Sequence, residues 1–338
     1  MTWLTGRRWE AQSQRLSSFL LPATVGAFAA LASAPLAASI GLSTATRYPI
    51  EGSDCRAFEK RGTRMQRHAP ATDRPQVRTA LLLAAGLGMR LAPLTVALPK
   101  CLVSVSGVPI LERLVGSLDS HGIERLVIVT GYRAEMIRDY LGESFGGIAI
   151  EYLLSPLFAT TNNSYSLWLA RQLIDEAFLL LESDVVFDDH LLAPLLQPNR
   201  IAVSRQLPWM SGTTVTLDAG GNVKAFYPPP PGVYDQHCTD PDHFMAVNIC
   251  SLTRDTWGEV CERLDYYVAA GRTGCFYESV FAEMAAAGSM APAAVIFPSA
   301  RWYEIDTPAD RDAAELVFPR QLDAAGESGR RTPSGAAG

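Results

Sequence analysis

The chain has 338 residues, of which 48% are hydrophobic, and a formal net charge of -6 at pH 7. This apolar content can form a large buried core, so disorder of the whole chain is excluded. The acidic balance argues against nucleic acid as a partner, because a phosphate backbone attracts proteins with a basic excess. The six cysteines are scattered without a Cys-x-x-Cys pair, which indicates free thiols and neither a zinc site nor a disulfide framework.

Residues 1–78 form a leader that we set apart from the folded unit. Its segment 16–46 carries no charged residue and follows three arginines, which is the outline of a secretory signal or a weak membrane span. Pro22 and Pro35 interrupt a helix there, and Met65 offers a later start for the chain. We expect a disordered or non-native leader, with a targeting or anchoring segment and a small packed appendage as alternatives.

From residue 79 onward, segments of strand and helix character alternate along the chain. Strands that alternate with helices predict a largely parallel sheet covered by helices on both faces. In such a sheet, ligands bind beyond the carboxyl ends of the strands. The predicted strands are 80–84, 125–130, 148–153 and 178–181, and the predicted helices are 111–121, 134–141 and 164–174.

The second half adds short strands, a hairpin turn at 218–222 and a proline run at 228–231 that is expected in an exposed loop. The further predicted strands are 201–204, 213–217, 223–227, 247–252, 295–298 and 302–306, and the further helices are 257–270, 276–287 and 308–317. The sequence therefore predicts one α/β domain over residues 79–318. Its fold is expected to be Rossmann-like, with three layers, the middle one a mostly parallel, mixed sheet. Residues 319–338 are expected to form a disordered tail.

The turn after the first strand has the composition of a phosphate-binding loop. Gly86 and Gly88 let backbone N–H groups approach an anion, and Arg90 and Lys100 supply positive charge. A dinucleotide-binding loop is excluded because Leu91 stands where its third glycine would be, and a Walker loop needs Gly-Lys followed by Ser or Thr. A purely structural turn is the alternative.

Aspartates follow two of the predicted strands. Asp184 comes shortly after the strand at 178–181, and Asp306 ends the strand at 302–306. Magnesium in proteins is typically held by one or two carboxylates together with substrate phosphate oxygens. The two aspartates, taken with the glycine loop, therefore predict a magnesium site. The alternative is that each aspartate only caps the helix that follows it.

These motifs resemble, in order and spacing, the nucleotidyltransferases that activate phosphorylated sugars and alcohols. The resemblance covers residues 79–318. It is carried by Gly86-x-Gly88-x-Arg90, Pro99-Lys100, Ser183-Asp184 and Glu304-Ile305-Asp306. Within that superfamily, the segments 161–169 and 302–307 look most like those of bacterial phosphocholine cytidylyltransferases. The resemblance implies the nucleotidyltransferase type of fold, Mg²⁺ as cofactor, CTP as nucleotide, and a small phosphorylated alcohol or phosphonate as acceptor.

The resemblance also implies a role for each site residue. Arg90 would hold the β- and γ-phosphates, and Lys100 would bridge the α-phosphate and the incoming phosphate. Asp184 and Asp306 would carry Mg²⁺, and Glu182 would hold a metal-bound water. The implied nucleotide-binding residues are Ala84, Ala85, Gly86, Gly88, Asn162 and Asn163, and the implied acceptor-binding residues are Glu278, Trp209 and Tyr227. For the two asparagines, helix capping alone is the alternative.

Two other functions stay open from the sequence. One is a sugar-1-phosphate nucleotidyltransferase that uses UTP, dTTP or GTP, and the other is a catalytically silent regulatory or binding subunit of the same fold. The presence of Arg90, Lys100, Asp184 and Asp306 together argues against the silent subunit. Free thiols and a nucleotide-using site predict a cytoplasmic protein without a membrane partner, and a homo-oligomer is left open.

Overall fold

The computed structural model describes residues 77–207, 210–233, 237–238 and 240–319. The predictions for the leader up to residue 76, for the tail from residue 320 and for Trp209 lie outside the described residues. None of the helices in the described ranges is both long and apolar enough to cross a membrane.

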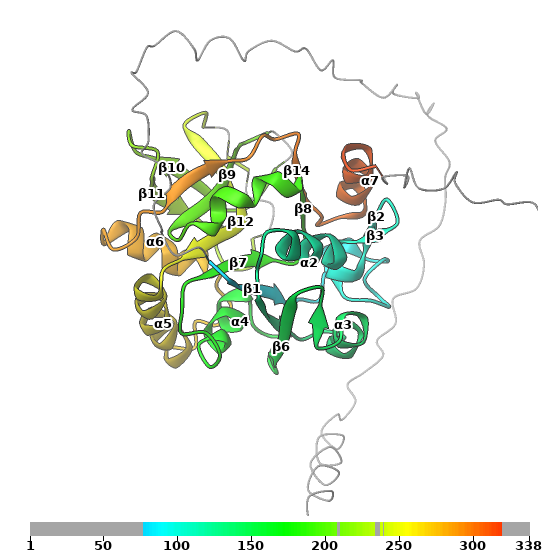
Figure 1. Ribbon diagram of the computed structural model, residues 1–338. Helices are drawn as coiled ribbons and strands as arrows, with labels where there is room; N and C mark the ends of the chain where they lie inside the picture. Colours follow the sequence, from blue (N-terminus) through cyan, green and yellow to red (C-terminus); the bar gives the residue numbers. More distant parts are fainter. Residues whose placement is uncertain (1–76, 208–209, 234–236, 239, 320–338) are drawn as a thin grey trace, which may run out of the picture. The chain divides into compact units, whose positions relative to one another are not determined.

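A ten-stranded mixed sheet forms the centre of the fold (Figure 1). Within it, β1 (Thr79–Ala84) lies between β4 (Arg125–Thr130) and β7 (Phe178–Glu182), and it is parallel to both. β6 (Ile148–Leu154) extends this parallel part beyond β4, and the short β5 (Ser144–Phe145) closes that edge. All six residues of β1 are buried, as expected of a strand covered on both faces.

The other half of the sheet is mostly antiparallel. β12 (His243–Leu252) pairs antiparallel with β7, and β10 (Thr214–Leu217) and β11 (Val223–Tyr227) follow it outward. β9 (Arg200–Arg205) pairs with β12 and also, in parallel, with β13 (Ala293–Ile296). The prediction of a mixed α/β sheet is thus confirmed, and its parallel pairs lie in the portion from β7 to β6 and between β9 and β13.

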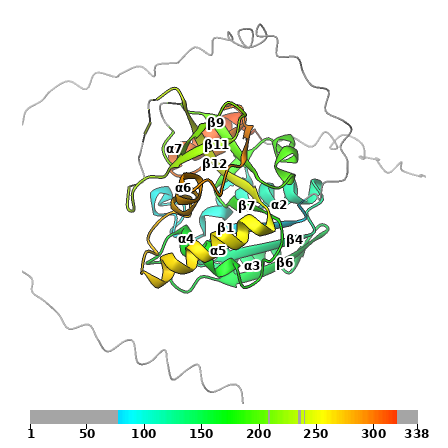
Figure 2. The ribbon, with the colours of Figure 1, turned by 90° about the vertical axis from the view of Figure 1, so that its left-hand side faces the viewer.

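Helices cover both faces of the sheet, because side chains along β1 alternate between two cores. Leu82 packs into the core on one face and Leu81 into the core on the other. Figure 2 shows the second face, where α5 lies toward the viewer. The first core takes in α2 (Ile110–Ser120), α3 (Ala134–Leu141) and α7 (Pro308–Val317), and the second takes in α4 (Asn163–Ala170), α5 (Arg254–Ala269) and α6 (Glu278–Ala286).

Most predicted elements are confirmed to within a few residues, and α4 differs most among the helices. It ends at Ala170 instead of residue 174. Beyond this end, the backbone N–H groups of Leu173 and Ile174 both bond to the carbonyl of Ala170, while their own carbonyls accept hydrogen bonds from the side chains of Arg125 and Trp257. β12 begins at His243, four residues before its predicted start at Val247, because its first half pairs with both β10 and β9.

Gly131 follows β4 and packs against the loop after β1. A Cβ at this position would lie 2.6 Å from the carbonyl oxygen of Ala85 and 2.7 Å from the Cβ of Phe158. We expect Gly131→Ala to lower the free energy of unfolding by about 1–3 kcal/mol, because backbone atoms must move to admit the methyl group.

Gly116 provides the matched control, because a Cβ added to this residue of α2 would meet no atom within 4 Å. Gly116→Ala should leave stability unchanged or raise it by up to about 1 kcal/mol. Urea unfolding of both variants measures the difference, and equal losses of stability would contradict the expectation.

Candidate active site

The glycine loop lies at the carboxyl end of β1. Gly88 has a φ of 63°, and a Cβ there would lie 3.1 Å from Cγ2 of Thr95 and 3.2 Å from Cβ of Lys100. The Thr95 hydroxyl donates a hydrogen bond of 2.7 Å to the carbonyl of Gly88, which fixes the turn. No atom lies within 4 Å of where a Cβ of Gly86 would be. Gly88 therefore sets the shape of the loop, and the backbone at Gly86 is open to a ligand.

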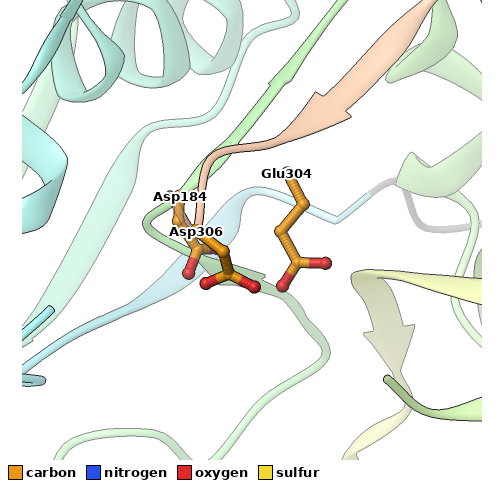
Figure 3. A group of neighbouring side chains, drawn as sticks. All are labelled: Asp184, Glu304 and Asp306. Atoms are coloured by element: carbon orange, nitrogen blue, oxygen red, sulfur yellow. The ribbon is translucent and has the colours of Figure 1, made fainter. Parts of the chain in front are cut away.

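Three carboxylates meet beside this loop. Asp184 follows β7, whereas Glu304 and Asp306 lie at the end of β14 (Trp302–Glu304). β14 pairs antiparallel with β8 (Val185–Phe187), the strand directly after Asp184. This pairing brings one oxygen of each carboxylate to within 4.8 Å of the others (Figure 3). β8 is not among the strands predicted from the sequence, and its pairing with β14 brings the acidic group together.

Two basic side chains contact the acidic group. Lys100 Nζ lies 2.7 Å from Asp184 Oδ2 and 2.5 Å from Asp306 Oδ1, and Arg90 Nη2 lies 2.9 Å from the same Asp306 oxygen. Burial alone would lower the pKa of Lys100, but the two aspartates raise it well above its usual range. Burial opposes ionisation of Asp306, and the nearby Lys100 and Arg90 charges nevertheless lower its pKa. The ammonium of Lys100 and the carboxylate of Asp306 are therefore charged at neutral pH.

The acidic group has the ligand chemistry of a magnesium site. Asp184 Oδ1 is buried, and the described residues offer it no hydrogen-bond partner. Burial, together with the charges of Asp306 and Asp184, raises the pKa of Glu304 well above its ordinary value. A divalent cation would pair the orphaned oxygen and reverse that repulsion. Glu304 was not among the predicted ligands, although its place two residues before Asp306 on an extended segment puts both on one side.

Glu182 lies apart from the three carboxylates. Its Oε1 accepts a hydrogen bond of 3.0 Å from the side-chain amide of Asn163. Burial raises the pKa of Glu182 well above its ordinary value, and the charges of Asp184 and Glu278 add to this effect. The predicted role of Glu182 in holding a metal-bound water stays a prediction, and the structure adds Glu278 as its second acidic neighbour.

The two asparagines tie the start of α4 to the segment before α6. Asn162 caps the helix, since its Oδ1 accepts a hydrogen bond of 2.8 Å from the backbone N–H of Asn163. Its own backbone N–H donates to the carbonyl of Thr273, and the Asn163 Oδ1 accepts from the backbone N–H of Tyr277. Asn162 thus has the capping role that was the alternative, while both asparagines also line the cavity described next.

A cavity of ≈ 490 Å³ joins the glycine loop to the second half of the sheet. It is lined by all the predicted site residues except Trp209, which lies outside the described residues, and Tyr227. The Tyr227 ring instead packs on His243, with ring centroids 4.5 Å apart. The predicted residues that the structure brings together here are Ala84, Ala85, Gly86, Gly88, Arg90, Lys100, Asn162, Asn163, Glu182, Asp184, Glu278 and Asp306.

Glu278, the first residue of α6, also lines the cavity. Its side chain is almost completely buried, and the residue is 6% exposed. Oε1 accepts a hydrogen bond of 3.4 Å from the Thr213 hydroxyl, while Oε2 has no partner among the described residues. Burial raises the pKa of Glu278 to about 7.

Magnesium binding can be tested through stability. We expect Mg²⁺ at a hundredfold excess over its dissociation constant to raise the Tm of the wild-type protein by roughly 5–10 °C. Asp184→Asn should remove most of this rise, because it deletes a buried anionic ligand. Asp188→Asn is the matched control, since Asp188 pairs with Arg301 outside the acidic group. Thermal melts over a range of MgCl₂ concentrations measure the effect, and an undiminished rise in the Asp184 variant would contradict it.

Because burial raises the pKa of Glu278, we expect that replacing its carboxyl by a neutral group stabilises the protein, and more so at high pH. The unfolded chain ionises this carboxyl near the ordinary value of 4.5, and the folded protein ionises it near 7. The free energy of unfolding therefore falls as pH rises through this window, and the total loss above pH 7 is on the order of 3 kcal/mol. Glu278→Gln should be more stable than the wild type at pH 8, with a smaller gain at pH 5. Chemical unfolding at both pH values checks this, and a variant less stable than the wild type at pH 8 would refute it.

Comparison with known proteins bears on this site. Residues 79–200 match the family described as nucleotidyl transferase. Over 253 residues the chain is 33% identical to the CMP-5'-(3-aminopropyl)phosphonate synthase of Streptomyces rubellomurinus, covering 72% of this chain and 39% of that protein. Over 123 residues it is 36% identical to the 2-aminoethylphosphonate cytidylyltransferase of Lancefieldella rimae, covering 36% of this chain and 48% of that protein. The chain thus spans less than half the length of either relative.

A solved structure shares the fold. The CTP:phosphocholine cytidylyltransferase from Streptococcus pneumoniae matches with a TM-score of 0.60 and 21% sequence identity, covering 72% of this chain and 99% of that one. This match confirms the predicted nucleotidyltransferase type of fold, and the family match confirms the resemblance found in the sequence. Residues 79–200 thus match the nucleotidyl transferase family, and the chain is similar to cytidylyltransferases that are named for phosphonates and for choline phosphate.

Proposed function

We propose that this protein transfers CMP from CTP to a small phosphorylated alcohol or phosphonate and releases pyrophosphate. One observation carries the proposal: Lys100 and Arg90 meet three carboxylates beside an open glycine loop, in a cavity large enough for substrates. Positive charge and backbone donors at this point suit a triphosphate. The two relatives named for aminoalkylphosphonates support a cytidylyl transfer to a phosphonate.

The proposed reaction needs positioning and charge stabilisation from the protein, but no nucleophilic side chain. A phosphonate or phosphate oxygen of the acceptor attacks the α-phosphorus of CTP. The bond between that phosphorus and the oxygen bridging to the β-phosphorus breaks, and pyrophosphate leaves with the bonding electrons. The attacking oxygen is already ionised at neutral pH, so a general base is unnecessary.

Each basic residue has a distinct part in the proposal. Arg90 would bind the β- and γ-phosphates, and its planar guanidinium suits paired phosphate oxygens. Lys100 would contact both the α-phosphate and the acceptor oxygen, where its charge offsets the repulsion between two anions. Asp184, Glu304 and Asp306 would hold Mg²⁺, which supplies further positive charge to the triphosphate.

The nucleotide and acceptor would occupy opposite parts of the cavity. Gly86 and Gly88 would present backbone N–H groups to the phosphates, and Asn162 and Asn163 would lie on the nucleotide side. Glu278 would lie on the acceptor side, at the start of α6. A cytoplasmic location and CTP as the bound nucleotide belong to the same proposal.

We expect turnover with CTP and little or none with UTP, dTTP or GTP. Pyrophosphate release from each triphosphate, measured with a pool of alcohol phosphates, phosphonates and sugar phosphates, gives the preference, and mass spectrometry identifies the product. Asp184→Asn should lower the rate with CTP by at least about a hundredfold, because it removes a charge from the proposed metal site.

Each other outcome supports a different function. Turnover with UTP or dTTP and a sugar 1-phosphate, but none with CTP, would identify a sugar-phosphate nucleotidyltransferase. Absence of turnover with every triphosphate would support the catalytically silent subunit.

A further inference from the structure

Two acidic side chains line the cavity outside the proposed magnesium site. Glu182 lies at the end of β7 and Glu278 at the start of α6, and no basic side chain of the described ranges forms an ion pair with either. Nor do they belong to a group of three metal-ligating side chains in the described part of the chain. Neither carboxylate therefore forms an ion pair with a basic side chain of the described residues, although the Lys100 charge acts on Glu182 through space.

The hydrogen bonding of Glu278 is incomplete. The residue is 6% exposed, its Oε2 has no partner in the described structure, and its Oε1 has a long bond of 3.4 Å from the Thr213 hydroxyl. A buried polar atom without a partner is costly, more so when it carries charge, and it calls for an explanation. The raised pKa of Glu278 reflects the same deficit, since burial penalises its charge.

Asn163 links Glu182 to the residue that precedes Glu278. Its side-chain N–H donates to Glu182, and its side-chain oxygen accepts from the backbone N–H of Tyr277, the residue before Glu278. One amide thus connects β7 to the first turn of α6. Because the Glu182 carboxylate is hydrogen-bonded and the Glu278 side chain is buried before a ligand arrives, little ordering would be needed when it binds.

We propose that the acceptor carries a primary ammonium group, and that Glu278, assisted by Glu182, binds it. This inference rests on the proposed function and specifies the acceptor class as an aminoalkylphosphonate or an amino-alcohol phosphate. A primary ammonium brings three N–H donors and a positive charge, which together satisfy the unpartnered oxygen. A quaternary ammonium has no N–H to donate, and an uncharged alkyl end would leave both carboxylates unpaired.

Binding to the full chain tests the inference without requiring turnover. The titration uses Mg²⁺ and α,β-methylene-CTP, in which a carbon replaces the oxygen whose bond would break. The ligands are 2-aminoethylphosphonate, phosphoethanolamine, 3-aminopropylphosphonate, phosphocholine, and propylphosphonate and butylphosphonate, whose alkyl ends carry no charge. We expect each aminoalkylphosphonate to bind at least about tenfold more tightly than the alkylphosphonate of equal length, as a charge-assisted hydrogen bond implies. Comparison of 3-aminopropylphosphonate with phosphoethanolamine, which has the same number of atoms between phosphorus and nitrogen, separates phosphonates from phosphate esters.

Variants then assign the preference to Glu278. Glu278→Gln should bring the ratio of the two affinities close to one, and Glu278→Asp, which keeps the charge, should retain part of it. Glu283→Gln is the matched control, because Glu283 lies on the same helix and bonds to Tyr267 outside the cavity lining. This control should keep the full preference.

Three results would overturn the inference: equal affinity of the wild type for ammonium and alkyl ligands, tighter binding of phosphocholine than of every primary amine, or a preference that survives in Glu278→Gln. CMP transfer from CTP, measured in parallel, separates this inference from the proposed function. Equal CMP transfer to acceptors with and without an ammonium group upholds the proposed function and rejects the ammonium site. Preferential binding of ammonium ligands without any CMP transfer upholds the ammonium site and rejects the proposed function.

Discussion

The central strand β1 is the constraint on which the rest of the structure depends. It is hydrogen-bonded to parallel neighbours on both sides and buried on both faces, so helices must cover the sheet above and below. The chain leaves this buried strand at its carboxyl end, where Gly88 turns it without a side chain in the way. β7 ends at the same edge because it runs parallel to β1, and Asp184 therefore lies near the glycine loop.

Opposite charges offset one another at this edge of the sheet. Lys100 lies between Asp184 and Asp306, and Arg90 adds a further contact to Asp306, so a dense set of opposite charges is stable although largely buried. Asp184 still keeps one oxygen without a partner. In the same cavity, Glu278 also has an oxygen without a partner, and no basic side chain of the described residues forms an ion pair with it. A positively charged group of a ligand would pair with the unpartnered oxygens of Asp184 and Glu278.

The sequence by itself determined the features that depend on local chemistry. An apolar run followed by glycines predicts a buried strand and an anion-binding turn, because burial and backbone freedom are properties of those residues. The order and spacing of the motifs also brought Lys100, Asp184 and Asp306 into one hypothesis, although the strand before Asp306 lies in a separate antiparallel pair with β8. The helices α3 and α7 have the predicted bounds because apolar spacing and, for α7, a capping box at Thr307 define them locally.

Only the tertiary structure decided which side chains meet. Glu304 joins the acidic group through the pairing of β14 with β8, and a contact between segments more than a hundred residues apart leaves no local pattern. Tyr227 packs on His243 instead of lining the cavity, because the register of three antiparallel strands sets where it points. Glu278 was predicted as an acceptor residue from resemblance, whereas its unpartnered oxygen is visible only once α6 packs against the sheet, since burial depends on the whole fold.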